Sequence, residues 1–317
     1  SATWPHFAGL DYIVTSALTV HAGGTLTIED EVQVLFNTNQ YFNIYGHLAA
    51  AGTADAGVVF APNGAVTWSS LNFRGTGSGD LAYCTIEGSS NGVYGLSSGT
   101  IAISHSEVRN NSYGLRGDNG VMELTSVSIH DNSSYGFNST GMGLTLVDAN
   151  VTCHSNGTGI YVANIPGLNL TAGLTAIDNT STGIVVQNCN GAVIDNALVT
   201  GNASSGFSFN DCGEFTLGAG NVIGGPGLEN GWPVTITAGS SPNPACVIPT
   251  AGNTNNDIRV AGGSSSRSAT WPLFAGLDYI VTAVLTVNAG ATHTIEDGVQ
   301  VLFNTNQYFN IYGHLAA

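Results

Sequence analysis

Residues 101–115 read IAISHSEVRNNSYGL, and versions of this stretch recur through the middle of the chain. Each version opens with an apolar-x-apolar triplet, and successive triplets start 20 to 24 residues apart. The triplets start at Leu81, Ile101, Met122, Leu144, Leu168, Ala192 and Phe215. A glycine followed by an apolar residue, such as Gly114 before Leu115, recurs with a similar period. Two independent markers therefore predict a structural repeat of 20 to 25 residues.

The spacing inside the repeat decides its secondary structure. Apolar residues two apart fit strands, because side chains of a strand alternate between its faces. No neighbouring residues show the spacing of three, four and seven that an amphipathic helix requires. The sequence thus predicts an all-β solenoid in which each repeat is one coil.

An asparagine precedes most of the repeat glycines by three or four residues. Asparagine tolerates bent turn conformations, and its amide can bond the equivalent amide one coil away. We therefore expect a stacked asparagine ladder, and in its first coil both Asn110 and Asn111 fit the position. The predicted ladder consists of Asn110, Asn132, Asn156, Asn179 and Asn202.

Two strings of the sequence resemble a known family of proteins. The string SEVRNNSYGL at 106–115 is similar to coils of right-handed parallel β-helix repeat proteins, which have a pectate-lyase-like fold. The string GTLTIE at 24–29 resembles the entry module of secreted bacterial and archaeal surface proteins of this type, although Asp30 replaces their usual proline. The resemblance implies a right-handed parallel β-helix with coils of about 20 to 25 residues.

Composition excludes several function classes. Only 8% of the 317 residues are charged, the formal net charge is −16, and lysine is absent. A nucleic-acid partner would need a basic footprint, so we expect none. We also expect no membrane insertion, because no apolar run approaches the length of a span. The lysine-free, asparagine- and threonine-rich composition favours an extracellular or cell-surface location.

The two ends of the chain are near-copies. Residues 268–317 repeat residues 1–50 without a gap and differ only at positions 6, 16, 17, 21, 24, 26 and 31 of the first copy. Identity this high indicates recent tandem duplication rather than structural constraint. We therefore predict an entry module over 1–50, regular coils over 51–267, and the start of a second tandem unit over 268–317.

No catalytic constellation is evident in the sequence. The 21 acidic residues are scattered without an Asp-Asp pair, although glycosidases need two carboxylates roughly 5 to 10 Å apart. His105, His130 and His154 lie nine, six and five residues before their glycines. We therefore expect surface or turn histidines that do not stack in one column, and no metal ligands. No catalytic, cofactor-binding or metal site is predicted.

Weaker candidates are an acidic turn, glycosylation sites and an aromatic stripe. Glu29, Asp30 and Glu31 could hold calcium, but Gly298 replaces Glu31 in the second copy, so a solvated turn is favoured and no cofactor is expected. Asn138 and Asn169 are the sequons we expect to face outward and accept a glycan. The set Tyr41, Tyr45 and Tyr94 could stack on carbohydrate, although core or ladder packing is favoured.

The sequence thus favours a structural protein and not an enzyme. We expect an extracellular tandem-repeat protein whose β-helices stack end to end on copies of themselves, forming an adhesive filament, stalk or surface layer that could bind surface glycans. The alternatives are a secreted polysaccharide lyase or glycoside hydrolase, and a passive glycan-binding β-helix. Turnover of acidic polysaccharide that a single carboxylate substitution abolishes would favour the enzyme.

Overall fold

The computed structural model describes residues 1–141, 143–146 and 150–317, and every regular element in these ranges is a strand. Contacts divide the chain into two compact units, Ser1–Ile160 and Tyr161–Ala317, with the boundary inside β21 (Thr158–Ala163). Each unit is a parallel β-solenoid, as the sequence predicts. The three sequence segments 1–50, 51–267 and 268–317 remain a prediction. No helix long and apolar enough to cross a membrane occurs among the described residues.

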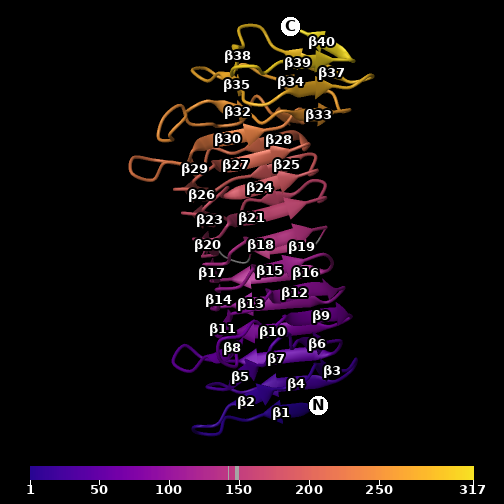
Figure 1. Ribbon diagram of the computed structural model, residues 1–317, viewed down its shortest axis with the longest axis vertical. Coiled ribbons are helices and arrows are strands. Elements are labelled where there is room, and N and C mark those ends of the chain that lie inside the picture. The colour runs from indigo at the N-terminus through magenta and orange to yellow at the C-terminus, as the bar shows by residue number, and fades with distance from the viewer. Residues whose placement is uncertain (142, 147–149) are drawn as a thin grey trace. The chain divides into compact units, whose positions relative to one another are not determined.

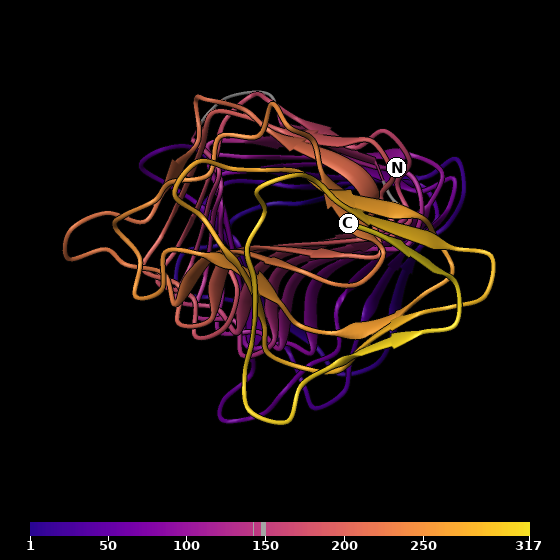
Figure 2. The same ribbon diagram turned by 90° about the horizontal axis from the view of Figure 1, so that it is seen from above.

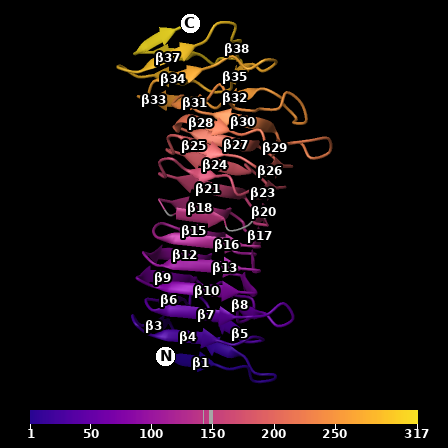
Figure 3. The same ribbon diagram turned by 180° about the vertical axis from the view of Figure 1, so that it is seen from behind.

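Unit 1 contains three parallel sheets, and each coil contributes one strand to each sheet. Sheet 1 consists of β1 (Ala2–Trp4), β4 (Thr25–Ile28), β7 (His47–Ala51), β10 (Ser78–Ala82), β13 (Thr100–Ser104), β16 (Val121–Thr125) and β19 (Gly143–Leu146). Sheet 2 consists of β2 (Tyr12–Val14), β5 (Gln33–Phe36), β8 (Val58–Pro62), β11 (Cys84–Glu87), β14 (Glu107–Arg109), β17 (Ser128–His130) and β20 (Thr152–His154). Sheet 3 consists of β3 (Leu18–Val20), β6 (Phe42–Ile44), β9 (Leu71–Gly75), β12 (Asn91–Ser97), β15 (Tyr113–Gly117) and β18 (Tyr135–Thr140). Figure 1 shows the strands of sheet 2 one above another, and Figure 3 shows those of sheet 3.

Unit 2 repeats this pattern with its own strands. One sheet joins β22 (Asn169–Leu170), β25 (Ala192–Ile194), β28 (Gly213–Leu217) and β31 (Ser240–Pro242). A second column of strands consists of β23 (Leu174–Ile177), β26 (Ala197–Thr200) and β29 (Val222–Ile223). A third column consists of β24 (Ile184–Gln187), β27 (Ser205–Asn210), β30 (Trp232–Ile236), β32 (Ile258–Val260), β35 (Tyr279–Val281) and β38 (Val301–Phe303). Two short sheets follow: β33 (Gly263–Ser265), β36 (Leu285–Val287) and β39 (Phe309–Ile311), and β34 (Ala269–Trp271), β37 (Thr292–Ile295) and β40 (His314–Ala316).

The core of unit 1 follows from the alternation of faces along each strand. In sheet 2 the middle residues of successive strands pair in register and point inward, and Ile86, Val108 and Ile129 are fully buried. Burying one such side chain stabilises the fold by about 1.5–3 kcal/mol. Figure 2 views the coils of unit 1 end-on, with the strands of successive coils behind one another. The residues on either side of these buried positions therefore face outward.

An asparagine ladder lies at the turn between sheets 2 and 3. In unit 1 Asn111 donates from its backbone N and from Nδ2 to Oδ1 of Asn132, at 3.0 and 3.1 Å, and Asn132 donates likewise to Asn156, at 3.1 and 2.9 Å. The sequence predicts Asn110 for the first rung, but the rung is Asn111. Asn110 occupies the preceding left-handed position, with φ of 55°, and is exposed.

The ladder of unit 2 has the same geometry. Asn179 donates to Asn202, and Asn202 to Asn230, with Nδ2–Oδ1 distances of 2.8 and 2.9 Å. Asn230 in turn donates to Asn253 at 3.0 Å, so the ladder includes two residues that the sequence prediction left out. All four side chains are buried, where an unpaired amide would be costly. The ladder asparagines therefore serve the fold.

Candidate functional site

The outward side chains of sheet 2 in unit 1 form two columns. Because parallel strands pair in register, residues that are far apart in the sequence become neighbours one coil apart. One column runs Thr85, Glu107, Ser128 and Thr152, and the other runs Glu87, Arg109, His130 and His154. The second column and Glu107 place charged and imidazole groups side by side on one half-exposed face.

Arg109 lies at the centre of a charged network on this face. Its Nε lies 2.8 Å from Oε2 of Glu87, and its Nη1 lies 3.1 Å from Oε2 of Glu107. The hydrogen bond to Glu87 raises the pKa of Arg109 above its ordinary value. Glu107 also accepts from His130, whose Nε2 lies 2.7 Å from Oε1. The guanidinium and one imidazole are thus bridged by a single carboxylate.

His130 lies between two carboxylates and against a second imidazole. Its Nδ1 is 2.7 Å from Oδ2 of Asp131, while its Nε2 faces Glu107. The His154 ring stacks on the His130 ring, with centroids 4.6 Å apart and planes 6° apart. The sequence prediction that these histidines do not stack is wrong for this pair. The prediction aligned the histidines by the number of residues before the next glycine. The turn from Asn132 to Gly136 is one residue longer than the turn from Asn156 to Gly159. This count therefore placed His130 and His154 at different strand positions, although they pair in register.

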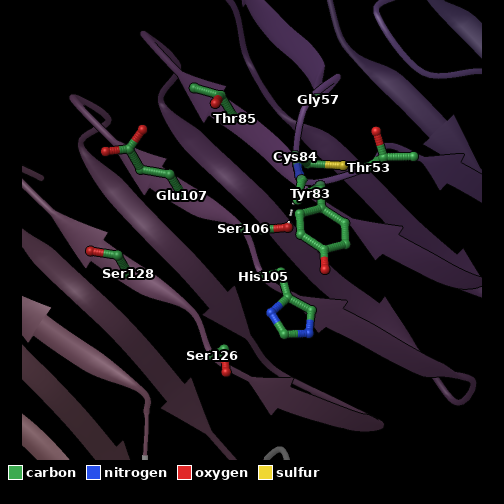
Figure 4. Close-up of a pocket in the computed structure, with 11 residues that line it drawn as sticks. Thr53, Gly57, Tyr83, Cys84, Thr85, His105, Ser106, Glu107, Ser126 and Ser128 are labelled. Carbon is green, nitrogen blue, oxygen red and sulfur yellow. Dashed lines mark hydrogen bonds between the residues drawn. The ribbon is translucent and has the colours of Figure 1, made fainter.

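A pocket of about 430 Å³ adjoins the network at the corner where the chain enters sheet 2. Tyr83 and His105 lie at this corner with φ of 52° and 50°, and their rings stack with centroids 4.8 Å apart. Figure 4 shows the two rings beside each other and Glu107 at the same pocket. Glu107 therefore belongs both to the pocket wall and to the charged network.

The buried wall of the pocket is fixed and chemically inert. The backbone N of Cys84 donates to Oγ of Ser106 at 2.9 Å, and this hydroxyl donates to the Ser104 carbonyl at 2.7 Å. Burial raises the pKa of the Cys84 thiol to about 12, so the thiolate is not available as a nucleophile.

Tyr83 and His105 are the aromatic groups of this pocket that can exchange protons. His105 is exposed and Tyr83 is half-buried. In the described part of the chain neither side chain is engaged in a hydrogen bond, and the two rings contact each other by stacking. Imidazole and phenol groups act as general acids and bases in enzymes. The arrangement therefore offers two adjacent proton carriers beside a fixed charge network.

The other predicted positions are separate from this site. Asn138 is half-buried on the outward side of sheet 3 and Asn169 is exposed on β22, and their modification remains a prediction. In the acidic turn, Glu31 adopts a φ of 59° and its carboxylate lies 3.0 Å from Nδ1 of His6. The equivalent Gly298 has a φ of 79°, so the replacement suits a left-handed position. Among the described residues no group of three or more His, Cys, Asp or Glu is arranged to hold a metal ion.

Comparison with known proteins identifies the fold. The family described as right-handed β-helix region matches residues 57–223. No curated protein sequence matches the chain. The solved structure of the periplasmic alginate epimerase AlgG is similar, with a TM-score of 0.54 at 12% identity over 94% of this chain and 77% of that one. A double mutant of the same epimerase gives 0.55 at 11% identity over 96% and 78%. The Azotobacter vinelandii mannuronan C-5 epimerase AlgE4 A-module gives 0.44 at 15% identity over 93% and 91%.

These matches contradict two predictions from the sequence. The sequence favours a structural filament protein and not an enzyme, whereas the similar solved structures are of epimerases. At 11–12% identity the likeness itself shows the fold alone. In a parallel β-helix, residues that are neighbours in space lie about one coil apart in the sequence. The proximity of Tyr83, Glu87, Glu107 and Arg109 is therefore not visible along the chain.

Proposed function

We propose that this chain, which belongs to the right-handed β-helix family, is a polysaccharide-modifying enzyme that acts on uronic-acid glycans at the sheet 2 face of unit 1. The observation that carries the proposal is the open Tyr83–His105 pair beside the network of Arg109, Glu107 and His130. The fold likeness to an alginate epimerase supports this substrate class. An activity of this kind belongs outside the cytoplasm, in the periplasm or beyond the cell.

The proposed chemistry begins with removal of the proton on the sugar carbon next to the carboxylate. His105, as a neutral imidazole, takes this proton, and negative charge develops on the carboxylate oxygens. The guanidinium of Arg109, on the same face, stabilises this charge. It is already held by Glu87 and Glu107, so it needs little reorganisation during the reaction.

The position of Tyr83 favours elimination as the second step. Its ring stacks on His105, so both proton carriers approach the sugar from one side. A phenol there can protonate the departing glycosidic oxygen as the carbon–oxygen bond breaks and a ring double bond forms. Epimerisation would instead return a proton to the opposite face of the sugar. We therefore propose a lyase-type reaction, the first alternative that the sequence left open.

The test is turnover of polymannuronate and polyguluronate by the full chain. Elimination produces a double bond that absorbs in the ultraviolet, whereas epimerisation changes the proton NMR spectrum without cleavage. We expect His105→Gln and Tyr83→Phe each to slow turnover by about 10²–10⁴-fold. The matched control is His21→Asn, because His21 is exposed and the second copy carries Asn288 at that position.

Two results would refute the proposal. The first is no product from any uronic-acid polymer with the folded wild-type chain. The second is turnover that both site variants leave at the wild-type rate. Inversion of the sugar carbon without chain cleavage would support the proposed site, but the reaction would then be epimerisation and not elimination.

A further inference from the structure

Sheet 3 of unit 1 presents a second outward array of polar and aromatic side chains, on strands that do not belong to sheet 2. Its strands lie one above another (Figure 3) and pair in register, so one residue per coil falls in a single column. The column is Asn43, Asn72, Tyr94, Arg116 and Asn138, and Arg74 lies two residues beyond Asn72 on β9. We call these six residues the sheet 3 array. Asn72 is buried, and its amide bonds Ser70 and Asn43.

Aromatic rings hold Arg116 in place within the array. Its guanidinium carbon lies 4.6 Å from the centre of the Tyr94 ring and 5.5 Å from that of Tyr113. Tyr113 stacks in turn on Tyr135, with centroids 5.4 Å apart. Cation–π contacts of this kind fix the guanidinium without neutralising its charge. The array therefore contains an ordered positive group on an aromatic support.

The hydrogen-bonding capacity of Arg116 is largely unused. In the described residues its one carboxylate neighbour is Asp118, at 3.7 Å from Nη2, and its Nε is buried without a hydrogen-bond partner. Asp118 also accepts the Tyr94 hydroxyl at 2.6 Å. A guanidinium has five N–H donors in a planar fork that matches a carboxylate. Because the Arg116 side chain is partly exposed, an additional anionic partner can bond its terminal Nη groups, but not the buried Nε.

The array is locally positive on an acidic chain. Arg74 donates from Nε to Oδ1 of Asn43 at 3.1 Å, a neutral partner that leaves its charge uncompensated. Burial and the bond to Asp118 raise the pKa of Tyr94, while the charges of Arg116 and Arg74 act to lower it, as expected if both flank its ring. Among the described residues of this face, two guanidinium groups thus accompany one carboxylate, that of Asp118, although the formal net charge of the chain is −16.

We propose that the sheet 3 array binds an acidic polysaccharide without reacting with it. Arg116 and Arg74 pair with carboxylates of successive sugars, Tyr113 and Tyr135 pack against sugar rings, and Asn138 bonds hydroxyl groups. Of the three tyrosines that the sequence suggested for stacking, Tyr94 lies in this array, as the support of Arg116. This inference does not depend on the proposed reaction at sheet 2. The sheet 3 array lies on other strands, so it can bind a polysaccharide whether or not sheet 2 catalyses a reaction.

The experiment measures binding of a mannuronate hexasaccharide to the full chain by titration calorimetry. The His105→Gln, Tyr83→Phe double variant serves as the background, so that turnover does not interfere. We expect Arg116→Gln to raise the Kd about tenfold or more, since it removes a charge-assisted hydrogen bond. Arg116→Lys should recover part of the affinity, because lysine restores the charge but not the planar fork.

The matched control is Arg259→Gln on β32 of unit 2, which should leave the Kd unchanged. A neutral mannose hexasaccharide should bind at least about tenfold more weakly than the acidic one. Equal binding of the two sugars, equal loss in the Arg259 and Arg116 variants, or no loss in the Arg116 variant would each overturn the inference. Absence of binding by the double variant, while the wild-type chain turns over uronic-acid polymers, would overturn this inference and leave the proposed reaction standing.

Discussion

His293 is a buried histidine on β37, and replacing it with leucine should stabilise the protein. Its side chain lies edge-on to Trp271, with ring centroids 4.4 Å apart, and its Nε2 has no hydrogen-bond partner among the described residues. The equivalent position in the first copy is Leu26, which is buried on β4. The same coil therefore accepts leucine, and His293→Leu removes an unpaired polar atom worth about 1–3 kcal/mol.

The stability gained by His293→Leu should increase as the pH falls. Burial lowers the pKa of His293 from 6.5 to about 4. Between these values the unfolded chain binds a proton that the folded chain does not, so stability falls as pH falls. The difference between the two pKa values corresponds to about 3 kcal/mol, lost between about pH 6.5 and about pH 4. His293→Leu abolishes this loss, so its advantage grows in acid.

The assay is urea unfolding of the full chain, followed by circular dichroism at several pH values. The stability difference between variant and wild type should rise by about 3 kcal/mol from about pH 8 to about pH 4. The reverse change in the first copy, Leu26→His, should introduce a similar acid sensitivity. A constant difference across this range would show that His293 is not held neutral by burial, and the reasoning would fail.

Three further predictions concern the coils and the thiols. Asn132→Ala should destabilise unit 1 by at least about 2 kcal/mol, because it leaves the backbone N–H and Nδ2 of Asn111 without their acceptor. Gly114→Ala should cost about 1–3 kcal/mol, because a Cβ there would lie 2.6 Å from the Gly136 carbonyl oxygen. Thermal unfolding checks both. The Cys84 thiol should resist alkylation at about pH 8 in the folded protein, since burial raises its pKa to about 12, and mass spectrometry should detect labelling only after denaturation.

Each of these predictions has an internal control. Asn138→Ala removes an outward asparagine outside the ladder, and a loss equal to that of Asn132→Ala would argue against the ladder as the cause. Gly24→Ala should be tolerated, because the second copy carries Ala291 there, and equal destabilisation by both glycine variants would contradict the steric argument. Rapid native labelling of Cys84 would mean that the pocket wall opens, whereas Cys153, which is buried in the core, sets the unreactive reference.

The fold was predictable because its signals repeat once per coil. Inward residues such as Val108 and Ile129 must be apolar in every coil, so their period is visible in one sequence. The candidate site has no such signal, because the residue type in its column changes from Glu87 to Arg109 to His130. Packing of the core does not require a particular residue type at these outward positions, so no repeated pattern marks them in the sequence. Their proximity appears only when strand register is known, and a one-residue difference in turn length is enough to hide it.

The in-register pairing of sheet 2 has a consequence for how this surface can change. Outward side chains there contribute little to the core, so a substitution at Glu107 or Arg109 alters the chemistry of the face while Val108 between them keeps the coil folded. Exchange of one whole coil would replace one group in each column at once and preserve the backbone ladder on both sides. In this solenoid the surface residues can therefore change while the coil architecture is kept. A duplicated coil can acquire different outward residues and, with them, a different binding specificity.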